Sequence, residues 1–132
     1  MLSSQTQSKV LQSLCVFSGY SPSMMDSMRF AVGTSNNVLI KTRGRDTSLD
    51  FKGALALATR GSARAVHMED RVGGFDVGKQ FDAQRIRMNS YHDTVLSGFE
   101  SMEDIIQKFV FVGNDRNVVQ LWIQGRLVKN TL

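Results

Sequence analysis

A glycine-containing segment provides the sequence's nearest approach to a known chemical motif. Residues 73–80, GGFDVGKQ, come close to the pattern of a phosphate-binding loop. In such a loop, glycines let backbone N–H groups surround the phosphates, a lysine supplies charge, and a Ser or Thr hydroxyl binds Mg²⁺. Gln80 stands where that hydroxyl belongs, and neither a clear leading strand nor a following helix frames the segment. We therefore expect an ordinary hairpin loop.

Metal-binding residues are scarce. His67 begins a His-Met-Glu sequence that superficially matches the His-x-Glu of zinc deaminases, but those enzymes also need a Pro-Cys-x-x-Cys segment. A structural zinc site needs four ligands, usually Cys or His. The chain has two histidines and one cysteine, widely spaced. The sequence therefore predicts no metal site, and we expect no cofactor.

Candidate nucleophiles are equally poorly supported. His92 and Asp93 could form half of an acid–base pair, yet no Gly-x-Ser-x-Gly turn exposes a serine beside them. Cys15 lies in an apolar stretch, where a thiol usually packs as a small hydrophobic group. The prediction from these motifs is that the chain has no catalytic residues and is not an enzyme.

Positive charge gathers in residues 41–64, which carry six basic and two acidic side chains within a chain of net charge +4. Arginine suits phosphate because its planar group donates two hydrogen bonds at once. The alternative is ordinary solvated charge, and Phe51 is the segment's only aromatic residue for stacking on a base. The candidate nucleic-acid-binding residues are Arg43, Arg45, Arg60 and Arg64.

A second candidate surface lies near the C-terminus. Trp122 alternates with Leu121 and Ile123, so it faces the opposite side of a strand from them. Trp and Arg are common at interface hot spots, and methionine adapts to varied partners, although methionines at helical spacing usually pack in a core. The candidate interface residues are Trp122, Arg116, Arg126, Met24 and Met28.

The N-terminal elements that would position these residues are predicted to be helices. Apolar residues at helical spacing favour a helix over residues 5–18. A second helix would begin with Ser21 as its cap and Pro22 in its first position, and Gly33 would end it. Residues 38–40 then read as the start of a strand.

Residues 44–80 admit two interpretations. Alternating apolar residues favour strands with bulges, which is the interpretation we prefer. The sequence of residues 47–50 also resembles a helix capping box, with Gly61 as a helix stop. Residues 84–88 then read as an amphipathic strand.

The C-terminal third has clearer signals. Residues 101–104 form a capping pattern for a helix near residues 102–109. Residues 118–123 read as a strand, Gln124 and Gly125 as a turn, and residues 126–129 as the returning strand. The predicted fold class is α+β, with N-terminal helices, a mainly antiparallel sheet, one helix near residues 102–109 and a closing β-meander.

Size and composition complete the prediction. The 132 residues, with 42% apolar and 21% charged, fit one globular domain spanning residues 1–132. One cysteine fits a reducing compartment. The first residues lack the features of a secretory signal, and no apolar run approaches the roughly 20 residues that span a bilayer. We expect an intracellular protein, or part of a particle assembled in the cytoplasm, without membrane contact.

These observations lead to a non-enzymatic hypothesis. The chain is predicted to be a structural or interaction protein that acts as a homo-oligomer or as a subunit of a larger assembly, such as a virion or phage particle. The alternative is a basic nucleic-acid-binding module that uses segment 41–64. A small inhibitor-type binding protein is the third hypothesis.

Overall fold

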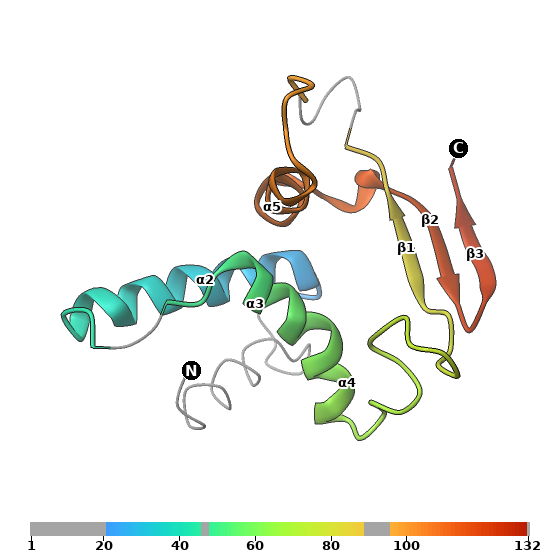
Figure 1. The fold of residues 1–132 in the computed structure, drawn as a ribbon, viewed down its shortest axis with the longest axis horizontal. Helices are drawn as coiled ribbons and strands as arrows, with labels where there is room; N and C mark the ends of the chain where they lie inside the picture. Colours follow the sequence, from blue (N-terminus) through green and yellow to red (C-terminus); the bar gives the residue numbers. More distant parts are fainter. Residues whose placement is uncertain (1–20, 46–47, 89–95, 132) are drawn as a thin grey trace. The chain divides into compact units, whose positions relative to one another are not determined.

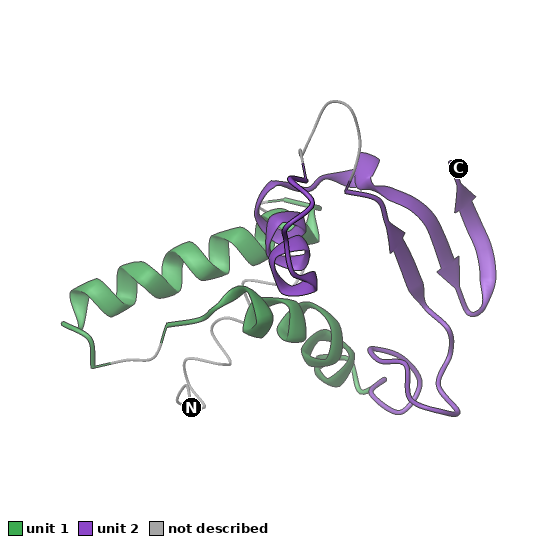
Figure 2. Ribbon diagram, turned by 45° about the horizontal axis from the view of Figure 1, so that its top comes forward, with its two compact units in different colours: residues 1–67 green, residues 68–132 purple. Residues whose placement is uncertain are grey.

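The computed structural model describes residues 21–45, 48–88 and 96–131. The chain divides into two compact units, Met1–His67 and Met68–Leu132, hereafter unit 1 and unit 2 (Figure 2). The described part of unit 1 is helical, and unit 2 carries a three-stranded antiparallel sheet (Figure 1). The predicted α+β class is therefore confirmed, whereas the single domain stays a prediction. The helix expected over residues 5–18 lies outside the described residues.

Helix α2, Met24–Lys41, is the longest element in the described part of unit 1. It begins at Ser23, whose hydroxyl accepts a hydrogen bond from the Asp26 backbone N–H at 3.2 Å. Its buried side is made by Met28, Ala31 and Val32. Side chains three and four positions apart share one face of a helix, so this stripe holds the helix against its own unit.

The predicted stop at Gly33 and the strand at residues 38–40 are wrong, because α2 runs through both. A glycine in a helix costs only about 1 kcal/mol relative to alanine, which burial of the apolar side outweighs. The helix ends later, at Lys41, and Arg43 and Gly44 after it both lie in the left-handed region. Gly44 N–H donates to Leu39 O at 2.9 Å and Arg43 N–H to Ile40 O at 3.2 Å, a Schellman motif.

The strands preferred for residues 44–80 are also wrong. Helix α3 (Phe51–Ala56) continues through a π-helical turn, η2 (Leu57–Gly61), into α4 (Ser62–Ala65). The alternative interpretation of this segment as a helix is correct, but the predicted stop at Gly61 is wrong. Asp50 is the cap, accepting from Gly53 N–H at 2.7 Å, and the helix passes through Gly61.

Small residues explain why this segment is helical. Ala54 and Ala63 are buried, and alanine is the strongest helix former. The segment is also fixed at its start, since Leu49 N–H donates to the Ser35 hydroxyl of α2 at 2.8 Å. A tertiary contact of this kind cannot be predicted from the local alternation of apolar and polar residues.

The sheet of unit 2 consists of β1 (Ala83–Ile86), β2 (Val118–Ile123) and β3 (Arg126–Asn130) in the order β1-β2-β3. The predicted closing meander is thereby confirmed. Gln124 and Gly125 form its turn with φ values of 51° and 76°. Both central residues of a type I′ hairpin turn need positive φ, and this turn matches the right-handed twist of the strands.

The helix predicted near residues 102–109 is confirmed as α5, Met102–Val112. Ser101 and Asp104 form the expected capping box, and Val110 is fully buried. A short 3-10 helix, η3 (Asp115–Asn117), then leads into β2. Across the residues that the structure describes, no helix is long and apolar enough to cross a membrane.

Candidate functional site

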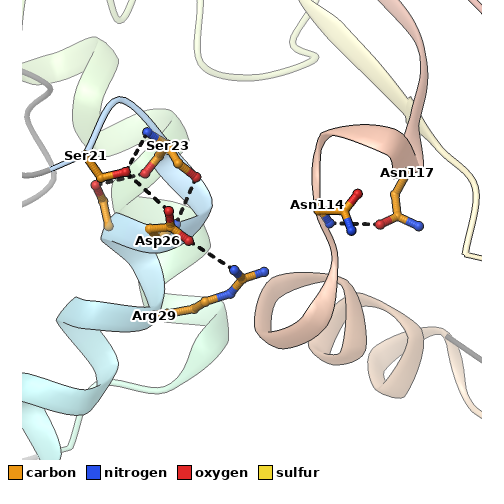
Figure 3. A network of polar contacts seen from close by, with 7 residues as sticks. Ser21, Ser23, Asp26, Arg29, Asn114 and Asn117 are labelled. Carbon is orange, nitrogen blue, oxygen red and sulfur yellow. Dashed lines mark hydrogen bonds and ion pairs between the residues drawn. The ribbon is translucent and has the colours of Figure 1, made fainter. Parts of the chain in front are cut away.

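The start of α2 carries a polar network in unit 1 (Figure 3). The Ser21 hydroxyl donates to one carboxylate oxygen of Asp26 at 3.2 Å, and Arg29 donates to the other at 3.1 Å. Ser21 also accepts from Ser23 N–H at 3.1 Å. The network fixes how the chain enters α2. The polar groups of the network form hydrogen bonds with one another, as expected for a helix cap.

The glycine-containing segment of unit 2 is a loop, as expected. Gly73 and Gly78 have φ values of 86° and 93°, which glycine adopts most easily. The ammonium group of Lys79 lies 2.9 Å from the Asp76 carboxylate. The lysine that a phosphate site would need therefore balances an acidic neighbour.

This loop is fastened to the β2–β3 hairpin by the residues that follow it. Asp82 accepts a hydrogen bond from Gln124 N–H at 2.7 Å, and Phe81 O accepts from Gly125 N–H at 2.9 Å. Farther back, Gln80 N–H donates to Arg71 O at 2.8 Å. Residues distant in sequence are thus held beside one end of the sheet.

A cluster of apolar side chains lies at that end. The Phe81 ring is 5.8 Å from the Trp122 ring at an interplanar angle of 65°, and 6.0 Å from the Phe75 ring. Leu127 is the partner of Trp122 across the β2–β3 ladder. Phe75 is 76% exposed, Phe81 49% and Leu127 43%. These four residues are called the aromatic surface below.

A polar ladder crosses all three strands beside the aromatic surface. The Arg85 guanidinium donates to the Gln120 side chain at 3.1 Å, and the Gln120 amide donates to Asn130 at 3.2 Å. Arg85 pairs with Gln120 and Ala83 with Trp122. Because residues two apart in a strand share a face, the ladder and Trp122 lie on the same face of the sheet.

Among the residues that the structure describes, Glu100 is the acidic residue whose pKa is shifted most. Its carboxylate pairs with Lys108 and accepts hydrogen bonds from the backbone N–H groups of Ser97 and Gly98, each at 2.9 Å. The Lys108 ammonium first, and then the bond from Ser97, hold the pKa of Glu100 far below its usual range. The hydrogen bonds from Ser101 likewise lower the pKa of Asp104. These groups organise the start of α5.

The five predicted interface residues are divided between the two units. In unit 1, Met28 is buried at 3% exposure and Met24 is half-buried, so Met28 packs in the core of its unit. In unit 2, Arg116 and Arg126 are exposed and Trp122 is half-buried. The interface role of these residues stays a prediction.

The four arginines of the basic segment are all exposed in unit 1. Arg43 and Arg45 follow the end of α2, whereas Arg60 lies in η2 and Arg64 in α4. The last two are four positions apart in a continuous helical stretch, which brings them onto one side. Nucleic-acid contact through this segment also stays a prediction.

A metal centre finds no support in residues 21–45, 48–88 and 96–131, where no three His, Cys, Asp or Glu side chains are grouped to hold an ion. His67 is exposed and has a φ of 55°.

Comparison with known proteins defines the family. Residues 2–128 match the model of the amidohydrolase family, so the chain belongs to that family. Guanine deaminase of Dictyostelium discoideum is 40% identical over 114 residues, covering 84% of this chain and 25% of that protein. Guanine deaminase of Homo sapiens is 38% identical over 118 residues, covering 86% of this chain and 26% of that protein.

Solved structures agree on the fold. The crystal structure of guanine deaminase from C. acetobutylicum, with guanine bound in its active site, has a TM-score of 0.71 at 21% identity and covers 83% of this chain. The E. coli guanine deaminase has a TM-score of 0.66 at 24% identity and covers 85%. The matched regions are 24% and 25% of those chains. This chain thus spans about a quarter of the length of its relatives.

The prediction of a non-enzymatic structural or assembly protein, viral particles included, is wrong, and so is the nucleic-acid-binding module as its alternative. The chain belongs to a family of enzymes. The error came from treating missing catalytic residues as evidence about the whole protein. A catalytic set distributed along a chain about four times the length of the matched region need not lie within these 132 residues.

Proposed function

We propose that this chain is part of an amidohydrolase that deaminates guanine. One observation carries the proposal: guanine deaminases of Dictyostelium discoideum and of four mammals are 37–40% identical to it over 114–118 residues. Identity of that level extends over most of this chain. It supports a shared substrate class more strongly than a common fold would.

The reaction exchanges the exocyclic amine of guanine for oxygen. Water adds to the ring carbon that bears the amine, a proton moves to the nitrogen, and ammonia leaves. Such attacks often use a metal-bound water. We assign none of these steps to the described residues, whose contribution is a folded framework: the capped helices of unit 1 and the fastened sheet of unit 2.

The test uses this chain in the context of a complete relative. In a chimera, the chain replaces the 114 matched residues of the Dictyostelium discoideum guanine deaminase. We expect the purified chimera to release ammonia from guanine, measured by a coupled assay. A folded chimera that leaves guanine unchanged would contradict the proposal, and the parent enzyme is the positive control.

One runner-up substrate class has an observation in its favour. The 5-methylthioadenosine/S-adenosylhomocysteine deaminase of Teredinibacter turnerae is 28% identical over 88 residues. A function shared with this relative would be deamination of an adenine ring that carries a substituted ribose. Supplying the same chimera with guanine and with 5-methylthioadenosine in parallel separates the two classes.

A further inference from the structure

Three nitrogen donors in unit 2 converge on one carboxylate, that of Glu100. The backbone N–H of Ser97 donates to one of its oxygens and the backbone N–H of Gly98 to the other, each at 2.9 Å. The Lys108 ammonium group pairs with the oxygen that Ser97 also contacts. Both carboxylate oxygens therefore have partners, and the Glu100 side chain keeps 9% of its surface exposed.

This arrangement has the chemistry of an anion-binding site. Neighbouring backbone N–H groups in a turn form a concavity that favours anions, and a lysine adds a point charge. Hydrogen bonds to an ionised acceptor are roughly twice as strong as those between neutral groups. The Lys108 ammonium first, and then the Ser97 bond, lower the pKa of Glu100, so its carboxylate is charged at neutral pH.

The site is separate from the cap of helix α5. The cap consists of Ser101 and Asp104, which exchange hydrogen bonds at the first turn of the helix. Ser97 and Gly98 precede that cap in the chain, and Lys108 lies in the middle of α5. The donors around Glu100 therefore include none of the free N–H groups at the start of the helix.

Charge and shape select the class of anion. Lys108 supplies one positive charge, which balances a single negative charge. The carboxylate of Asp104 interacts electrostatically with both Glu100 and Lys108, so it would repel an anion that carries a second negative charge. Two N–H donors, each bonded to a different oxygen, fit the two oxygens of a carboxylate. These features favour a monocarboxylate over a divalent anion.

We propose that Ser97, Gly98 and Lys108 form a monocarboxylate-binding site that Glu100 occupies as an internal ligand. While Glu100 is in place, an external carboxylate must compete with a tethered one, whose effective concentration is on the order of millimolar. Without that carboxylate, the same donors bind a free monocarboxylate such as acetate or formate. The inference goes beyond the proposed function and does not depend on the substrate.

Removal of the Glu100 carboxylate tests the site. The full chain carrying Glu100→Ala is titrated with sodium acetate against sodium chloride, at constant ionic strength and neutral pH. We expect its melting temperature to rise with acetate and then level off, because a ligand that binds only the folded state stabilises it. In ¹H–¹⁵N spectra, the amide resonances of Ser97 and Gly98 should shift with the same midpoint.

Matched variants separate binding from general effects of salt. Glu100→Gln fills the site with a neutral side chain of nearly the same size, so acetate should not change its melting temperature more than chloride does. Glu100→Ala combined with Lys108→Met lacks the charged donor and should need about tenfold more acetate, or more, for half saturation. The unmodified chain should show no saturable response to acetate.

Four results would overturn the inference. They are an equal response to acetate in Glu100→Ala and Glu100→Gln, acetate binding that Lys108→Met leaves unchanged, tighter binding of sulfate than of acetate, and amide shifts confined to residues other than Ser97 and Gly98. If Glu100→Ala is unfolded in chloride, circular dichroism in acetate replaces the melting curve. Recovery of the helical signal then supports the site, and no recovery rejects it.

Discussion

Asn117 and Arg87 join the end of β1 to the segment before β2 through a pair of reciprocal hydrogen bonds. The Asn117 side-chain amide donates to Arg87 O at 3.0 Å, and Arg87 N–H donates to Asn117 O at 2.8 Å, across thirty positions of sequence. The Asn117 side-chain oxygen also accepts from Asn114 N–H at 2.8 Å (Figure 3). One buried amide thus joins the end of β1 to the turn before β2.

Replacing this amide should destabilise unit 2. Asn117 is 1% exposed, so Asn117→Ala leaves the Arg87 carbonyl and the Asn114 N–H, which are both partly buried, without their partner. Buried polar groups left in that state cost about 1–3 kcal/mol. We expect a loss of that size in urea unfolding followed by Trp122 fluorescence. Asn37→Ala, at an exposed helical position, is the control, and an equal loss there would refute the specific role.

The Glu100–Lys108 pair should make stability depend on pH in the acid range. The pKa of Glu100 is lowered in the folded state from an ordinary value of 4.5, so its charged form favours folding above that value. Glu100→Gln should therefore be less stable than the unmodified chain at neutral pH. The difference should shrink as pH falls below about 4.5. A difference that is constant from pH 7 to pH 3 would contradict this, and Asp70→Asn is the exposed control.

The capping box of α5 should contribute measurably to its unit. Ser101 accepts from Asp104 N–H at 3.2 Å, while Asp104 accepts from Ser101 N–H at 2.9 Å. Loss of a helix cap costs about 1 kcal/mol. We expect Ser101→Ala to lower the free energy of unfolding by that amount. Ser101→Thr keeps a hydroxyl and should restore most of it, so equal losses in both variants would argue against capping.

Two glycines should respond oppositely to the same substitution. Gly33 lies inside α2, and a Cβ added there meets nothing within 4 Å. Gly33→Ala should therefore stabilise unit 1 by about 0.5–1 kcal/mol. Gly125 has a φ of 76°, so Gly125→Ala should destabilise the hairpin by about 1–2 kcal/mol. Thermal unfolding followed by circular dichroism measures both signs, and two shifts in the same direction would show that backbone conformation is not the cause.

Family membership rests on comparison with longer relatives, of which the 132 residues span about a quarter. The aromatic surface was only partly anticipated. Trp122 stood out by its type and strand position, but its contact with Phe81 depends on how the loop at residues 73–80 returns to the hairpin.

Local rules determined the elements whose signals lie within a few residues. The capping box at Ser101, the turn at Gln124–Gly125 and the meander after it were predictable, because short hydrogen bonds and positive-φ positions fix them. Tertiary structure decided the rest. Packing carried α2 through Gly33 and made residues 51–65 helical, and it joined Asn117 to Arg87, since burial links residues that no sequence window contains.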